Sequence, residues 1–73
     1  MKNKIKVLRA EKKLTQSQLA EMAGIARPTL AMIENEKAIP DGNTIAALVR
    51  ALEVPANEIF FDLGVVNKQR DSE

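Results

Sequence analysis

Apolar residues recur at spacings of three and four along most of the chain, and no segment shows the period-two alternation of a half-buried strand. This pattern predicts an all-α fold, a compact bundle of five helices over residues 2–13, 15–23, 27–35, 42–52 and 55–61. In the first three helices, a turn of about 100° per residue assigns these side chains to the buried faces: Ile5, Leu8, Leu19, Ala23, Ala26, Leu30 and Ile33.

Residues with capping chemistry mark the predicted helix ends. The run Thr15-Gln16-Ser17-Gln18 has the form of a capping box, in which the Thr hydroxyl and the Gln18 side chain take up free backbone N–H groups. Gly24 ends that helix, and Asp41 can cap the fourth. Pro28 is tolerated only in the first turn of a helix, which sets the start of the third helix near Arg27.

A short turn at Gly24 joins the second and third predicted helices. Two helices joined by a turn of three to four residues that contains Gly are typical of the helix-turn-helix. In its DNA-binding forms the second of these helices enters the major groove. Residues 14–35 therefore indicate a DNA-binding regulator.

The outer face of the third helix is poor in hydrogen-bond donors, and its members are Arg27, Pro28, Thr29, Ala31, Met32 and Asn35. Arg27 can bind a guanine edge through two hydrogen bonds, or it can hold a phosphate. The apolar members can pack against thymine methyl groups, and such a face would also recognise DNA through its sequence-dependent shape. A protein-contact patch is the alternative, because exposed Met suits adaptable interfaces.

Positive charge is concentrated in the first 13 residues, where six basic residues and one acid give a net charge of +5. Residues 14–36 and residues 37–73 each sum to −2, so the net charge of +1 conceals a basic end. Spacings of 4, 3 and 4 would give one stripe on a continuous helix to Lys2, Lys6, Arg9 and Lys13. Such a stripe suits contact with nucleic acid, although charged runs are usually a solvated helix face.

Composition argues against an enzyme. The chain has no His, Cys, Tyr or Trp, which removes the usual general base, thiol nucleophile and zinc ligands. No Gly-rich phosphate loop is present, so we expect no cofactor, no metal and no small-molecule substrate. No apolar run approaches the length of a membrane span and no signal peptide is evident, which predicts a cytoplasmic protein that does not bind membranes.

The span from about Ile5 to Phe60 resembles the lambda-repressor/Cro-like helix-turn-helix family, also called the XRE family. The resemblance rests on Ile5, Leu8-Arg9, Leu14-Thr15-Gln16, Gln18-Leu19-Ala20, Gly24-Ile25, Arg27, Thr29-Leu30, Ile33-Glu34-Asn35, Lys37, Pro40, Leu48, Ala51-Leu52, Val54 and Glu58-Ile59-Phe60. It implies a five-helix bundle that binds double-stranded DNA as a homodimer. Two copies of the third helix would lie in successive major grooves of a palindromic operator, with repression more common than activation.

The resemblance also implies roles for individual residues. Base contacts would come from Arg27, Pro28, Thr29, Ala31 and Met32. Phosphate contacts would come from Gln16, Thr15, Ser17, Asn35, Lys37 and Lys6. Side-chain amides and helix N-terminal N–H groups both suit an anion, which agrees with a phosphate at Gln16. Arg9 and Glu34 match a pair that often forms an internal salt bridge, so a structural role for Arg9 stands beside a phosphate contact.

Three positions depart from the family's pattern. Ala26 replaces the usual Ser or Thr, so the third helix lacks a side-chain N-cap, a loss of about 1 kcal/mol in typical cases. Glu36 replaces the usual Gly, which removes the easiest left-handed helix end and adds a negative charge near the expected phosphate path. Pro55 replaces the usual Ser before the fifth helix.

The C-terminal region bears on assembly. We expect a domain over residues 1–63 and a polar tail over residues 64–73. Ile59 and Phe60 would be buried in the monomer, whereas Phe61, Leu63 and Val65 are candidates for a homodimer interface or fold back over the helices.

Two other functions remain open. One is the antitoxin half of a toxin–antitoxin pair that represses its own operon. The other is a protein-interaction module in which Pro28, Ala31 and Met32 dock a partner and DNA is never touched.

Overall fold

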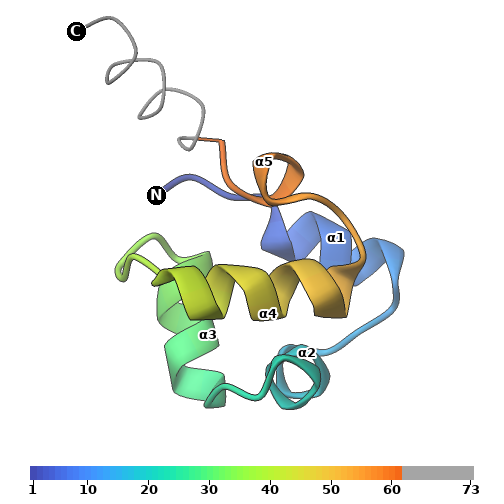
Figure 1. Cartoon of the computed structure of the whole chain (residues 1–73). Coiled ribbons are helices and arrows are strands. Elements are labelled where there is room, and N and C mark those ends of the chain that lie inside the picture. Colours follow the sequence, from blue (N-terminus) through green and yellow to red (C-terminus); the bar gives the residue numbers. More distant parts are fainter. Residues whose placement is uncertain (62–73) are drawn as a thin grey trace, which may run out of the picture.

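The computed structural model describes residues 1–61 and contains five helices in this range (Figure 1). They are α1 (Ile5–Glu11), α2 (Gln16–Ala23), α3 (Arg27–Glu34), α4 (Gly42–Leu52) and α5 (Ala56–Ile59). In Figure 1, α4 crosses the middle of the molecule, with α3 near its first turn and α2 below its C-terminal half. The predicted all-α bundle is confirmed for the described part of the chain.

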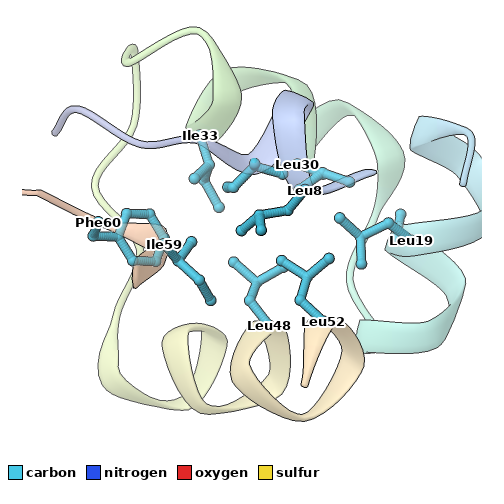
Figure 2. Packing of buried hydrophobic residues seen from close by; sticks show 10 residues of the cluster. Leu8, Leu19, Leu30, Ile33, Leu48, Leu52, Ile59 and Phe60 are labelled. Carbon is cyan, nitrogen blue, oxygen red and sulfur yellow. The ribbon is translucent and has the colours of Figure 1, made fainter. Parts of the chain in front are cut away.

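One apolar core joins all five helices (Figure 2). Its buried members are Ile5, Leu8, Leu19, Ala20, Leu30, Ile33, Leu48, Leu52, Ile59 and Phe60. Full burial of one such large side chain stabilises a fold by about 1.5–3 kcal/mol. The predicted inward faces are largely confirmed, but Ala23 is only partly buried and Ala26 is exposed. Ala26 has extended backbone angles as the N-cap of α3, so helical periodicity does not apply to it.

The first helix is shorter than predicted at both ends. Residues 2–4 lie outside the helix, and Asn3 forms an isolated antiparallel bridge with Phe60. The Lys4 N–H donates to the Ile59 carbonyl at 2.9 Å, and the Phe61 N–H donates to the Lys2 carbonyl at 3.0 Å. These bonds attach the N-terminus of the chain to the end of α5.

At its other end α1 stops at Glu11, and Lys13 takes a left-handed φ of 57°. Lys2 and Lys13 therefore lie outside the helix. The prediction that Lys2, Lys6, Arg9 and Lys13 form one helical stripe is wrong, because only Lys6 and Arg9 belong to α1.

The predicted N-terminal caps of α2 and α4 are present. Thr15 Oγ1 accepts a hydrogen bond from the Gln18 N–H at 3.0 Å, and Gln18 Oε1 accepts one from the Thr15 N–H at 2.8 Å. Asp41 Oδ1 accepts a hydrogen bond from the Thr44 N–H at 2.8 Å. Hydrogen bonds from Thr44, the backbone N–H above all, hold the pKa of the Asp41 carboxyl below its ordinary value. The last helix is shorter than predicted, since Pro55 is its N-cap and Ile59 its final residue.

The end of α3 has the hydrogen bonds of a Schellman motif despite the absence of Gly. The Lys37 N–H donates to the Met32 carbonyl at 2.8 Å, and the Glu36 N–H donates to the Ile33 carbonyl at 3.1 Å. Glu36 adopts the left-handed conformation that this motif needs, with φ at 63°. A side chain with a Cβ atom is strained there, by about 1–2 kcal/mol.

None of the helices in residues 1–61 has the length and apolarity that crossing a membrane requires. The predicted domain boundary after residue 63, and with it Leu63 and Val65, lies outside the described residues.

Replacing Glu36 with Gly should raise the free energy of unfolding by about 1 kcal/mol. Gly removes the steric cost of the left-handed turn, and the greater freedom of Gly in the unfolded chain offsets part of that gain. Urea unfolding followed by circular dichroism measures the effect. The matched control is Glu36→Ala, which removes the charge but keeps the Cβ atom. An equal gain from Ala would show that the charge, and not the backbone, is the source of the strain.

Candidate nucleic-acid interface

The turn between α2 and α3 sets the angle at which α3 leaves the core. Gly24 ends α2 with a left-handed φ of 71°, and the Ile25 N–H donates to the Ala20 carbonyl at 3.0 Å. Ala26 is extended, and Pro28 lies in the first turn of α3, where a missing N–H costs no intrahelical bond. Leu30 and Ile33 then fix the inner face of α3 in the core.

The outer face of α3 carries all five residues that were predicted as base contacts. Arg27, Pro28, Thr29 and Met32 are exposed, and Ala31 is half-buried. Arg27 is the one charged residue among them. With a rise of 1.5 Å per residue, Arg27 and Met32 are about 7.5 Å apart along the helix axis, roughly two base-pair steps of DNA. The face is therefore short, apolar at its centre, and supplied with strong donors only at its first residue.

A buried ion pair ties α3 to α1. Arg9 Nε lies 2.8 Å from Glu34 Oε2, and Arg9 Nη2 lies 3.2 Å from Glu34 Oε1. The Glu34 side chain has no exposed surface, and the Arg9 side chain is 18% exposed. Arg9 Nη1 also donates to the Leu14 carbonyl at 3.1 Å, just before α2. Three of the donors on Arg9 are thus engaged inside the protein.

Two more hydrogen bonds extend this ion pair to the outer face. Gln16 Nε2 donates to Glu34 Oε1 at 3.1 Å, and Arg27 Nη1 donates to Gln16 Oε1 at 3.2 Å. Side chains from α1, α2 and α3 therefore form one polar network of Arg9, Glu34, Gln16 and Arg27. Sequence reasoning selected each of these residues but not the contact between Gln16 and Arg27. The signal available was that Gln16 and Arg27 are the first residues of α2 and α3, two helices that one short turn joins.

The residues that were predicted to contact phosphate lie near the two ends of α3. Thr15, Gln16 and Ser17 are at the start of α2, and the Gln16–Arg27 hydrogen bond places Gln16 beside the first turn of α3. Lys6 Nζ donates to Asn35 Oδ1 at 3.3 Å, which places these two side chains together at the other end. Lys37, which is exposed, follows two residues later.

The separation of these two groups suits a groove of DNA. A helix of eight residues, the length of α3, is about 12 Å long, and the major groove is about 12 Å wide. Glu36, next to Lys37 in the sequence, is an exposed acid, whereas Glu34 is buried and paired with Arg9.

A groove of about 630 Å³ lies between the N-terminal segment, α1 and the end of α3. Its lining is Asn3, Lys4, Lys6, Val7, Glu34, Glu36 and Phe61. Val7 and Phe61 are each 51% exposed, so the groove has two accessible apolar side chains between charged ones. Within residues 1–61, no cluster of His, Cys, Asp or Glu has the composition of a metal site.

The family model described as helix-turn-helix matches residues 5–59, the span that forms the five helices. The chain belongs to this helix-turn-helix family. The resemblance to lambda-repressor/Cro-like proteins of the XRE family is thereby confirmed.

Two relatives are larger proteins. The immunity repressor protein of Bacillus phage phi105 is 36% identical over 67 residues, which are 92% of this chain and 46% of the phage protein. The HTH-type transcriptional repressor RghR of Bacillus subtilis (strain 168) is 32% identical over 69 residues, which are 93% of this chain and 51% of RghR. The chain thus spans about half the length of each.

Two further proteins match this chain over most of their own length. The uncharacterized HTH-type transcriptional regulator YgzD of Bacillus subtilis (strain 168) is 33% identical over 61 residues, 84% of this chain and 92% of YgzD. Among solved structures, the restriction-modification controller protein C.AhdI from Aeromonas hydrophila has a TM-score of 0.69 at 28% identity. The likeness covers 73% of this chain and 80% of C.AhdI.

Replacing Arg9 with Met should lower the free energy of unfolding by about 3 kcal/mol, because it leaves a buried carboxylate without its cation. Urea unfolding measures the loss. The control is Lys12→Met, which removes an exposed cation next to the same helix and should change stability by less than about 0.5 kcal/mol. Equal effects of the two substitutions would contradict the structural role of Arg9.

Proposed function

We propose that the chain is a sequence-specific DNA-binding regulator, a repressor that acts as a homodimer on a palindromic operator with α3 in the major groove. The observation that carries the proposal is the exposed outer face of α3 between two groups of candidate phosphate-binding residues. Membership of the helix-turn-helix family and the repressor names of two relatives support it. The same membership favours a regulator over an enzyme.

In this proposal Arg27 supplies the main direct base contact. A guanidinium can form two hydrogen bonds with the O6 and N7 atoms of guanine, and Thr29 adds a hydroxyl. Pro28, Ala31 and Met32 pack against thymine methyl groups. Direct contacts then cover few base pairs, so the remaining specificity comes from the shape and deformability of the operator.

Phosphate contacts hold the protein in register on both sides of the groove. At the start of α2 they come from the Thr15 and Ser17 hydroxyls and from first-turn N–H groups that have no intrahelical partner. At the end of α3 they come from Asn35 and from the ammonium groups of Lys6 and Lys37. A dimer has two copies each of Lys6 and Lys37. These four cations predict a slope of about −4 when the logarithm of the DNA-binding constant is plotted against the logarithm of the salt concentration.

The groove lined by Val7 and Phe61 is the surface that we assign to the dimer. A two-fold interface needs a patch that complements itself. This groove combines exposed apolar side chains with the oppositely charged side chains of Lys4 and Glu36. Leu63 and Val65, the other two candidates for this interface, lie outside the described residues.

A protein-interaction module is the second candidate, favoured by the exposure of Met32, at 48%, and of Ile39, at 77%. Both are large apolar side chains that a partner could cover. An interaction module would not bind DNA even at low salt, whereas the main proposal expects binding under that condition.

Selection of bound sequences from a random DNA pool, followed by fluorescence anisotropy, tests the main proposal. Arg27→Ala should weaken binding to the selected operator by about 5- to 150-fold and flatten base preference at one position, with a smaller effect on random DNA. The control is Arg50→Ala, which removes an exposed cation from α4 and should leave binding unchanged. Equal losses on operator and random DNA would reduce Arg27 to a phosphate contact. Failure of the wild type to enrich any sequence at low salt would favour the interaction module.

A further inference from the structure

The side chain of Asn3 contacts both the start of α1 and the end of α3. Its Oδ1 atom accepts a hydrogen bond from the Ile5 N–H at 3.1 Å, in the first turn of α1. Its Nδ2 group donates to the Ile33 carbonyl at 3.0 Å and to the Glu34 carbonyl at 3.5 Å, in the last turn of α3. A further hydrogen bond, to the Met1 carbonyl at 3.3 Å, stays within the N-terminal segment. Helix ends leave such backbone groups without intrahelical partners, and one amide here serves two of these ends.

Backbone pairing on either side of Asn3 holds this residue in place. The Lys4 N–H donates to the Ile59 carbonyl, and the Phe61 N–H donates to the Lys2 carbonyl. The side-chain amide also has one favourable orientation, because its oxygen faces an N–H group and its –NH₂ group faces carbonyl oxygens. The opposite orientation would replace both hydrogen bonds by contacts between like groups. Asn3 is therefore a fixed support for the end of α3.

The turn that ends α3 needs such support, because it contains no Gly. Glu36 takes its left-handed conformation, with φ at 63°, which a residue with a Cβ atom disfavours. The Glu36 N–H donates to the Ile33 carbonyl at 3.1 Å, the same carbonyl that accepts from Asn3 Nδ2. A carbonyl oxygen has two lone pairs and can accept both hydrogen bonds. Asn3 thus holds the group on which the strained turn closes.

We propose that Asn3 is a positioning residue for the phosphate contacts at the end of α3. This inference rests on the proposed function, in which Lys6, Asn35 and Lys37 hold the DNA backbone. Asn35 and Lys37 flank the strained residue of the turn, and Lys6 follows the residue whose N–H Asn3 accepts. All three therefore lie on the two helix ends that Asn3 joins. Groups that are ordered before binding lose less conformational freedom on binding, so Asn3 strengthens these contacts.

Simple attachment of the N-terminal segment is the alternative role for Asn3, which precedes the span of residues 5–59 that the family model matches. In that role its hydrogen bonds would add to the free energy of unfolding and leave the end of α3 unchanged in the folded protein. A positioning role instead predicts that residues 35–37 become mobile without global unfolding when the Nδ2 donor is lost. It also predicts equal losses on all DNA sequences, because phosphate contacts carry no sequence information.

The first measurement needs no DNA and uses Asn3→Ser and Asn3→Asp. Both variants keep an acceptor for the Ile5 N–H, but Ser is too short to reach the Ile33 carbonyl as well, and an ionised Asp has no donor for it. Backbone order parameters from NMR relaxation should fall from about 0.85 toward about 0.6 at residues 35–37 and stay unchanged in α2 and α4. The control is Asn43→Ser, the same exchange at an exposed position of α4, which should change none of them. Unchanged order parameters at residues 35–37 in either folded variant would overturn the proposal.

The second measurement is DNA binding by fluorescence anisotropy. Asn3→Ser should weaken binding to the selected operator and to random DNA by a similar factor, about three- to tenfold, and leave base preference unchanged. In a Lys37→Ala background the loss should be smaller, because one of the positioned groups is absent. Asn43→Ser should again have no effect.

Unchanged DNA binding by Asn3→Ser, or a loss confined to the operator, would overturn the positioning role. Fully additive losses in the double variant with Lys37→Ala would overturn it as well, since the two residues would then act independently. A wild type that binds no DNA, while the order parameters of Asn3→Ser fall as expected, would instead place the failure in the proposed function.

Discussion

The burial of one carboxylate constrains the whole helix-turn-helix. Glu34 ends α3 with no exposed side-chain surface, and a buried charge is tolerated only when it is paired and hydrogen-bonded. Arg9 from α1 and Gln16 from α2 meet that requirement. The last turn of α3 is thereby tied to both preceding helices. Apolar packing of Leu30 and Ile33 holds the inner face of the same helix in the core.

That constraint reaches the surface through Gln16. Because Glu34 accepts its –NH₂ group, the Gln16 oxygen is left for Arg27, the one charged residue on the outer face of α3. A stability element and a proposed recognition element are therefore parts of one network. In the proposed complex α3 makes few direct contacts with bases. They come from one guanidinium, one hydroxyl, and a short apolar surface of Pro28, Ala31 and Met32. Such a surface makes the position of Arg27 matter more than it would on a donor-rich helix.

Sequence reasoning was strong where local chemistry decides structure and weak where distant segments meet. Periodicity and caps predicted α2 and α4 because Thr15, Gly24 and Asp41 act on their own neighbours. The first helix was placed three residues too early, since pairing of residues 2–4 with residues 59–61 leaves no local trace. Glu36 shows the converse, as an unfavourable residue takes the left-handed turn because the surrounding fold requires it. The Gln16–Arg27 contact joins two helices, so the residue pattern of neither helix alone predicts it. The sites for phosphate and base contact remain predictions.

Mapping of amide chemical shifts of the isotope-labelled protein during titration with its selected operator tests the central claim most directly. We expect the changes to concentrate in the first turn of α2, on the outer face of α3 and in residues 35–37. The outer face of α4, with Asn43, Ala46 and Arg50, should remain unchanged. Changes confined to other surfaces, with α3 unaffected, would contradict the account that this helix reads DNA.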